Sequence, residues 1–152
     1  MEAVLYKFLK IVCFLLMLAM VAIIFLQVVA RYAFSNSLSW SEEIGRYLFV
    51  WMTFIGSAIA VRNRLHVSLD MFVIKFPGCI QKSCLVISYV SMMIFTGVLI
   101  YGGYRFVMRG SQQVSAAMQL PMHYVYVVLP VGGGLIFFYL MKNIYEDVFV
   151  RR

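Results

Sequence analysis

Charged side chains are scarce in this chain of 152 residues, in which Asp, Glu, Lys and Arg together make up 12% of the sequence and hydrophobic residues 64%. A soluble domain is usually about half apolar and about a quarter charged. So few charges cannot cover a water-exposed surface, which excludes an ordinary soluble domain. The mean hydropathy of +0.92 indicates that much of the surface faces lipid. The length predicts one membrane domain, residues 1–152.

Cysteine and histidine, the usual ligands of zinc and haem, are also rare. Cys13, Cys79 and Cys84 form no CxxC pair, and His66 and His123 are expected on opposite sides of the membrane, so they cannot share one iron. No glycine-rich phosphate loop or nucleophile motif is present in the sequence. We therefore predict no enzyme activity, no catalytic residue, no metal and no cofactor.

Four long apolar runs dominate the chain, at about residues 11–30, 40–61, 83–104 and 121–141. A helix of about 20 residues crosses the hydrocarbon core and satisfies its own backbone there. Barrel strands would alternate in polarity, and these runs do not. We predict an all-α integral membrane fold with four transmembrane helices and short interfacial amphipathic segments. The first run is longer than the apolar part of a signal peptide, so we expect a retained helix.

Lysine and arginine are distributed unevenly between the two sides of the membrane. Nine lie on the side of both chain ends: Lys7, Lys10, Arg62, Arg64, Lys75, Lys82, Lys142, Arg151 and Arg152. Four lie on the other side: Arg31, Arg46, Arg105 and Arg109. The positive-inside rule therefore predicts that both termini are cytoplasmic. This bias accounts for the net charge of +7, and we predict no nucleic-acid partner.

The start of the second run carries charges that are unusual at membrane depth. Ser39 and Glu42 have capping-box spacing, so the helix is predicted to begin near Trp40. Glu42 and Glu43 each lie within one turn of Arg46, and either acid is placed to pair with it. The group is either a solvated, capped helix start or a contact for a partner protein. Charge facing lipid is costly, which favours contact with a partner.

Residues 62–82 combine apolar side chains at helical spacing with polar ones between them. The apolar positions are Leu65, Leu69, Phe72 and Phe76. The pattern predicts a short amphipathic helix in the cytoplasmic interface, ending near Pro77. His66 and Asp70 are four residues apart and are placed to hydrogen-bond. A lone histidine of this kind is more often structural than catalytic.

The longest polar connection on the predicted outer side is residues 105–120, with hydroxyl and amide side chains at Ser111, Gln112 and Ser115. Pro121 suits the first turn of the fourth helix. Pro130 removes a backbone hydrogen bond within that helix and predicts a kink.

Small residues recur in the last three runs, at Gly56, Ala60, Gly97, Gly102, Gly103, Gly132, Gly133 and Gly134. Small side chains let helices approach closely in lipid. Two interpretations remain open: packing of helices within this chain, and packing against another membrane protein.

No apolar run has an Asp, Glu, Lys or Arg in its central part. Proton-coupled pumps and ion carriers usually keep an ionisable group there. The chain is therefore predicted to be a subunit that supports another protein. Two alternatives stay open: a membrane anchor of a respiratory enzyme, which needs a haem or quinone site, and a self-assembling small channel or exporter, which needs a polar pore.

Two motifs in the first half of the chain, QVVARY at 27–32 and SWSEEIGRYLFVWMTFIG at 39–56, point to a known family. Together they resemble the small membrane subunit of bacterial TRAP (tripartite ATP-independent periplasmic) transporters. The resemblance continues through Arg62, His66 and Asp70, then LPM at 120–122 and YVVLPVG at 126–132, and covers essentially the whole chain. One departure is Asn63-Arg64, where the family often has a glycine before the histidine.

The resemblance implies a role that composition does not show. In this family the small subunit pairs, in the bacterial inner membrane, with a large multi-helix subunit that moves substrate by an elevator-type motion. A periplasmic substrate-binding protein captures the substrate, commonly a carboxylate such as a dicarboxylate or sialic acid, and uptake is coupled to sodium. The small subunit is expected to be a static scaffold that also helps to dock the binding protein.

The resemblance also suggests which residues contact partners. Outer-face candidates are Trp40, Glu42, Glu43, Arg46, Ser111, Gln112 and Ser115. Candidates that brace the cytoplasmic side are Arg62, His66 and Asp70.

Overall fold

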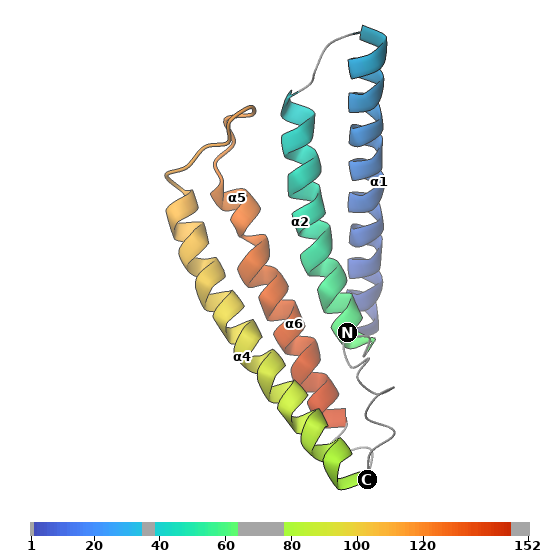
Figure 1. Ribbon diagram of the computed structural model, residues 1–152, viewed down its shortest axis with the longest axis vertical. Helices are drawn as coiled ribbons and strands as arrows, with labels where there is room; N and C mark the ends of the chain where they lie inside the picture. Colours follow the sequence, from blue (N-terminus) through green and yellow to red (C-terminus); the bar gives the residue numbers. More distant parts are fainter. Residues whose placement is uncertain (1, 35–38, 64–77, 147–152) are drawn as a thin grey trace.

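The computed structural model describes residues 2–34, 39–63 and 78–146 of the chain. The helices are α1 (Glu2–Phe34), α2 (Ser39–Arg62), α4 (Gly78–Gly110), α5 (His123–Tyr126) and α6 (Val128–Tyr145). Four segments are long and apolar enough to cross a membrane: Glu2–Ala33, Ser39–Arg62, Val86–Gly110 and His123–Tyr145. The predicted four-helix membrane fold is thus confirmed (Figure 1). The predicted amphipathic helix, with Arg64, His66 and Asp70, lies outside the described residues.

The long helices stand side by side, largely in one layer, in the order α1, α2, α6, α4 (Figure 1). Extensive contacts join α1 to α2, α2 to α6, and α6 to α4. The first and third spans therefore form the two edges of the layer. Their large apolar side chains are open to the surroundings, with Phe25 69% and Val98 66% exposed. Lipid is the solvent that accommodates such surfaces.

The buried core lies where α1 begins and α6 ends, which we call the terminal side of the molecule (Figure 1). Tyr139 and Leu140 of α6 are fully buried there, against Ile55 and Ala58 of α2. Leu9 of α1 joins the same cluster. The opposite side, which holds residues 111–122, is called the loop side below.

Glycines let α6 lie directly against both of its neighbours. A Cβ atom at Gly132 would lie 2.7 Å from the Cβ of Phe54 in α2, and one at Gly133 would lie 2.8 Å from a methyl group of Leu99 in α4. A side chain at Gly132 would push α6 away from α2, and one at Gly133 would force the side chains of Leu99 and Ile100 to move. Packing of small residues within the chain is therefore confirmed here. A different set of glycines has nothing within 4 Å of an added Cβ: Gly56, Gly97, Gly102 and Gly134.

The connection before the fourth span differs from its prediction. α4 continues to Gly110, so the non-helical loop is residues 111–122 and not 105–120. Pro121 does not start a helix, because it forms an antiparallel bridge with Val114, and helical structure begins at His123. The bridge draws the chain into a hairpin-like loop, which uses the proline as a loop residue.

α5 and α6 meet at Val127, whose dihedral angles stay helical (φ −55°, ψ −27°) and whose amide donates to the carbonyl of His123 at 3.0 Å, so Pro130 does not break the fourth span. Proline has no N–H to donate to the carbonyl of Tyr126, four residues earlier. The effect of the proline is therefore the loss of one helical hydrogen bond in the turn that precedes it.

Candidate functional site

On the loop side, Glu43 at the start of α2 holds the loop formed by residues 111–122. One carboxylate oxygen accepts hydrogen bonds from the hydroxyl of Ser115 at 2.8 Å and from the amide of Met118 at 3.1 Å. The other accepts from the amide of Ala117 at 2.9 Å. Three donors from one loop satisfy the acid, so its charge is directed into the protein and away from lipid.

Ser115 is the centre of this loop and is only 4% exposed. Its hydroxyl donates to Glu43 and accepts from the amide of Leu120 at 3.2 Å, while its own amide donates to the carbonyl of Leu120 at 2.9 Å. Gln119 has a φ of 55°, in the left-handed region that non-glycine residues seldom adopt. These contacts give the loop one defined shape.

Glu42 faces the other neighbour of α2. It accepts a hydrogen bond from the side-chain amide of Gln27 in α1 at 2.9 Å. Neither Glu42 nor Glu43 pairs with Arg46, which is exposed and has no ion pair with either acid within the described ranges. The expected pair on one helical face is therefore not formed, because both carboxylates bind donors outside α2.

The remaining loop-side candidates lie on the surface. Trp40 is 38% exposed. Ser111 donates its hydroxyl hydrogen bond to the carbonyl of Met108 at 2.8 Å, and the amide of Gln112 lies 3.2 Å from the carbonyl of Arg109. Both side chains stay open to solvent or to a partner. The structure thus leaves Trp40, Glu42, Arg46, Ser111 and Gln112 exposed, and turns Glu43 and Ser115 toward each other.

On the terminal side, Glu2 joins three helices. Its carboxylate lies 3.4 Å from Nε of Arg62, at the end of α2, and pairs with Lys142, near the end of α6. The Arg62 guanidinium also lies 3.6 Å from the ring centre of Tyr6, whose hydroxyl donates to Asn63 at 3.1 Å. Of the three candidates on this side, Arg62 lies within the described residues and contacts Glu2 and Tyr6, while His66 and Asp70 lie outside them.

A buried amide closes the same end of the molecule. Asn143 is 5% exposed, and its side-chain nitrogen donates to the carbonyl of Val61 at 2.7 Å. This bond satisfies a carbonyl in the last turn of α2, where helical partners run out. Sequence reasoning missed the roles of Glu2, Tyr6 and Asn143. The available signal was the presence of polar side chains close to the ends of the first and fourth apolar runs, on the side where the chain begins and ends.

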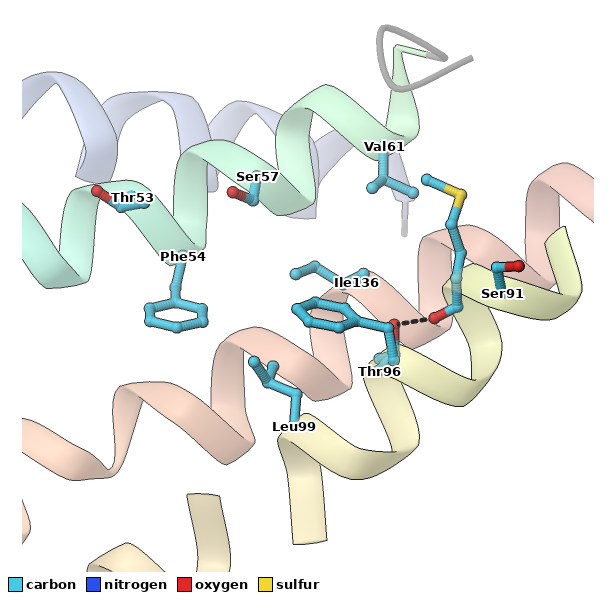
Figure 2. Close-up of a pocket in the computed structure, with 10 residues that line it drawn as sticks. Thr53, Phe54, Ser57, Val61, Ser91, Thr96, Leu99 and Ile136 are labelled. Carbon is cyan, nitrogen blue, oxygen red and sulfur yellow. Dashed lines mark hydrogen bonds between the residues drawn. The ribbon is translucent and has the colours of Figure 1, made fainter. Parts of the chain in front are cut away.

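A cavity of 490 Å³ lies between α2 and α4, with α6 as its floor (Figure 2). It is lined by Thr53, Phe54, Ser57, Val61, Ser91, Met92, Phe95, Thr96, Leu99 and Ile136. The hydroxyl of Thr53 donates to the carbonyl of Phe49 at 2.8 Å, and that of Thr96 to the carbonyl of Met92 at 2.7 Å. These two hydroxyl groups need no further hydrogen-bond partner, and six of the ten lining residues are apolar, so the cavity suits a mainly apolar occupant.

Metal-binding residues do not gather in the part of the chain that the structure describes, where no group of three or more His, Cys, Asp or Glu side chains is placed to hold an ion. The described residues therefore form polar contacts between helices at both ends of α2 and an apolar cavity between those ends.

Comparison with known proteins identifies the family. The sequence profile described as "Tripartite ATP-independent periplasmic transporters, DctQ component" matches residues 20–150. The chain is similar to a Haemophilus influenzae protein named as a TRAP transporter small permease, with 30% identity over 94% of this chain and 89% of that protein. It is 28% identical to the sialic acid TRAP transporter small permease protein SiaQ of Vibrio cholerae, over 86% of this chain and 76% of that protein.

A longer relative is also similar. The isethionate TRAP transporter permease protein DctMQ of Oleidesulfovibrio alaskensis is 26% identical over 87% of this chain, but the match covers only 22% of that protein. The profile match, the two small permeases and the four membrane spans agree with one another. The chain therefore belongs to the DctQ family, the small inner-membrane subunits of the tripartite ATP-independent periplasmic transporters.

Proposed function

We propose that this chain is the scaffold subunit of a sodium-coupled secondary uptake transporter for organic acids. Members of its family are transporter subunits and not enzymes. The similarity to DctMQ carries the proposal, since there a segment like this chain is 22% of one longer permease polypeptide. A separate small chain would have to meet the rest of such a permease through non-covalent contacts in the membrane.

The polar contacts at the two ends of α2 support a static role. Glu43 fastens its loop-side end to residues 115–118, and Glu2 fastens its terminal-side end to α1 and α6. The central parts of the apolar runs carry no Asp, Glu, Lys or Arg. A substrate carboxylate would therefore find its binding groups in the large subunit.

The loop side is the proposed meeting place with the periplasmic substrate-binding protein. The lysine and arginine bias favours cytoplasmic termini, and in that orientation residues 111–122 would face the periplasm. Arg46 and Gln112 are exposed there, beside a loop of defined shape. Sialic acid and isethionate, in the names of two similar proteins, are both organic anions, which supports an organic acid as substrate.

Reconstituted vesicles test the proposal. The complex of this chain with its large subunit is placed in proteoliposomes, its binding protein is added outside, and uptake of labelled organic acids is followed. We expect uptake to require an inward sodium gradient and to fail when a potassium gradient replaces it. Uptake by this chain without the large subunit, or uptake that ignores sodium, would contradict the proposal.

A further inference from the structure

We propose that the cavity between α2 and α4 seats a membrane-spanning helix of the large permease subunit, an inference that rests on the proposed function. The cavity lies within two membrane spans and opens to the surface, because Phe95 lines it and is 63% exposed. Thr53 and Thr96, on its opposite walls, have bonded hydroxyl groups. Six of the ten lining residues are apolar, and the others are small hydroxyl residues that include Ser57 and Ser91. A mainly apolar occupant from within the membrane fits this lining.

Two glycines with open space around an added Cβ, Gly56 and Gly102, lie beside the cavity lining without being part of it. Gly56 is three residues after Thr53 in α2, and Gly102 is three residues after Leu99 in α4, so each lies next to a lining residue on its helix surface. A Cβ at either glycine would meet no atom within 4 Å. Glycine weakens a helix, and in lipid it permits close approach of a second helix. Gly132 and Gly133 are already used in this way inside the chain.

The dimensions of the cavity fit one face of a helix. Its wall along α2, from Thr53 to Val61, is about 12 Å long at the helical rise per residue. That length corresponds to about two turns of a neighbouring helix, so the cavity can receive the side chains from about two turns of its occupant.

A lipid acyl chain is the other apolar occupant of a membrane. It would fill the space between the walls, but it has no need of glycine at their edges, because it brings no backbone that must come close. The similarity to DctMQ also favours a helix, since there a segment like this chain is joined in one polypeptide to the rest of a permease and is held close to it. These two observations favour the helix.

The test uses four glycines that all have open space around an added Cβ. Gly56→Leu and Gly102→Leu place a large side chain next to a lining residue, Thr53 or Leu99. The matched controls are Gly97→Leu and Gly134→Leu, at positions with no lining residue three or four places away on the helix. Each tagged variant is co-expressed with the large subunit, purified in mild detergent and compared for recovery of that subunit. Thermal unfolding of each variant, purified alone, verifies that it folds.

We expect the two cavity variants to recover about tenfold less large subunit than the wild type, and the two controls to recover it normally. Undiminished recovery by Gly56→Leu and Gly102→Leu would overturn this inference alone. A wild-type chain that recovers no large subunit would overturn the proposed function and this inference with it. Loss of co-purified phospholipid from the cavity variants, with unchanged subunit recovery, would assign the cavity to lipid and also overturn the inference.

A photocrosslinking pair gives a second readout that needs no bulky glycine replacement. Benzoylphenylalanine replaces Phe95, which lines the cavity. In the control it replaces the neighbouring Ile94, which is 64% exposed and is not a lining residue. We expect a crosslink to the large subunit from position 95 that is much stronger than from position 94. Equal crosslinking from both, or crosslinking from 94 alone, would contradict the placement of the helix.

Discussion

The carboxylate of Glu43 and the hydroxyl of Ser115 lie 2.8 Å apart, although 72 residues separate them in the chain. The contact fastens the loop between the third and fourth spans to the start of the second. Tyr47 adds to it, since its hydroxyl lies 3.5 Å from the sulfur of Met122. The two helix pairs α1–α2 and α4–α6 are therefore joined on the loop side as well as in the terminal-side core.

Glu43→Gln should release this loop. An amide in place of the carboxylate keeps one acceptor oxygen and points an NH₂ group at donors, so the amides of Ala117 and Met118 lose much of their hydrogen bonding. We expect their hydrogen exchange to become about tenfold faster or more, measured by mass spectrometry of residues 111–122. Glu42→Gln is the control, because Glu42 binds Gln27 and not the loop. Equal exchange in wild type and Glu43→Gln would contradict the contact.

Gly132→Ala should force α6 away from α2, because only a glycine, which has no side chain beyond hydrogen, fits against Phe54 at this contact. The added methyl would lie 2.7 Å from the Cβ of Phe54, so we expect a loss of about 1–3 kcal/mol in unfolding free energy. Gly134→Ala meets no atom within 4 Å and should be neutral or stabilising by up to about 1 kcal/mol through helix propensity. Unfolding in mixed micelles measures both. A Gly132→Ala protein as stable as Gly134→Ala would rule out the close contact.

Glu2→Gln should loosen the terminal side. The substitution removes the charge that meets Arg62 and Lys142, whose pairing with Glu2 is partly exposed. Such pairs are worth little singly, so we expect the melting temperature in detergent to fall by roughly 2–4 °C. Lys7→Gln, at an exposed position of the same helix, should leave it unchanged. A similar fall in melting temperature in both variants would indicate a general effect of charge and not the loss of the Glu2 ion pairs.

Arg46→Glu should weaken the encounter with the binding protein. Arg46 is exposed on the loop side, and reversal of its charge would repel acidic groups on a partner. We expect unchanged recovery of the large subunit, but about a tenfold higher binding-protein concentration for half-maximal uptake. Arg46→Lys keeps the charge and should behave as the wild type. Normal uptake by the Arg46→Glu variant would contradict a role for Arg46 in docking the binding protein.

The four spans could be predicted because length and apolar composition alone decide what crosses a membrane. Their limits could not, since local contacts outside the apolar runs extend or shorten a helix. α4 continues to Gly110, past the end of its apolar run, while the bridge between Val114 and Pro121 delays the fourth span until His123.

The partners of the acids were beyond prediction for a related reason. The spacing of residues along one helix predicts Arg46 as the ion-pair partner of Glu42 and Glu43, because a sequence reveals only which side chains are neighbours on the same helix. The structure supplies stronger competitors from elsewhere, namely Gln27 for Glu42 and three loop donors for Glu43. Glu2 and Asn143 were missed in the same way, since Lys142 and Val61 are far from them in sequence.

Purification of the tagged chain from its native host in a mild detergent, with mass spectrometry of what comes with it, tests the scaffold role most directly. We predict that a much larger multi-helix membrane protein is recovered in equal amount. That result would also direct the choice of organic acids for the uptake assay. Recovery of the chain alone, or only with copies of itself, would contradict the role of a scaffold subunit.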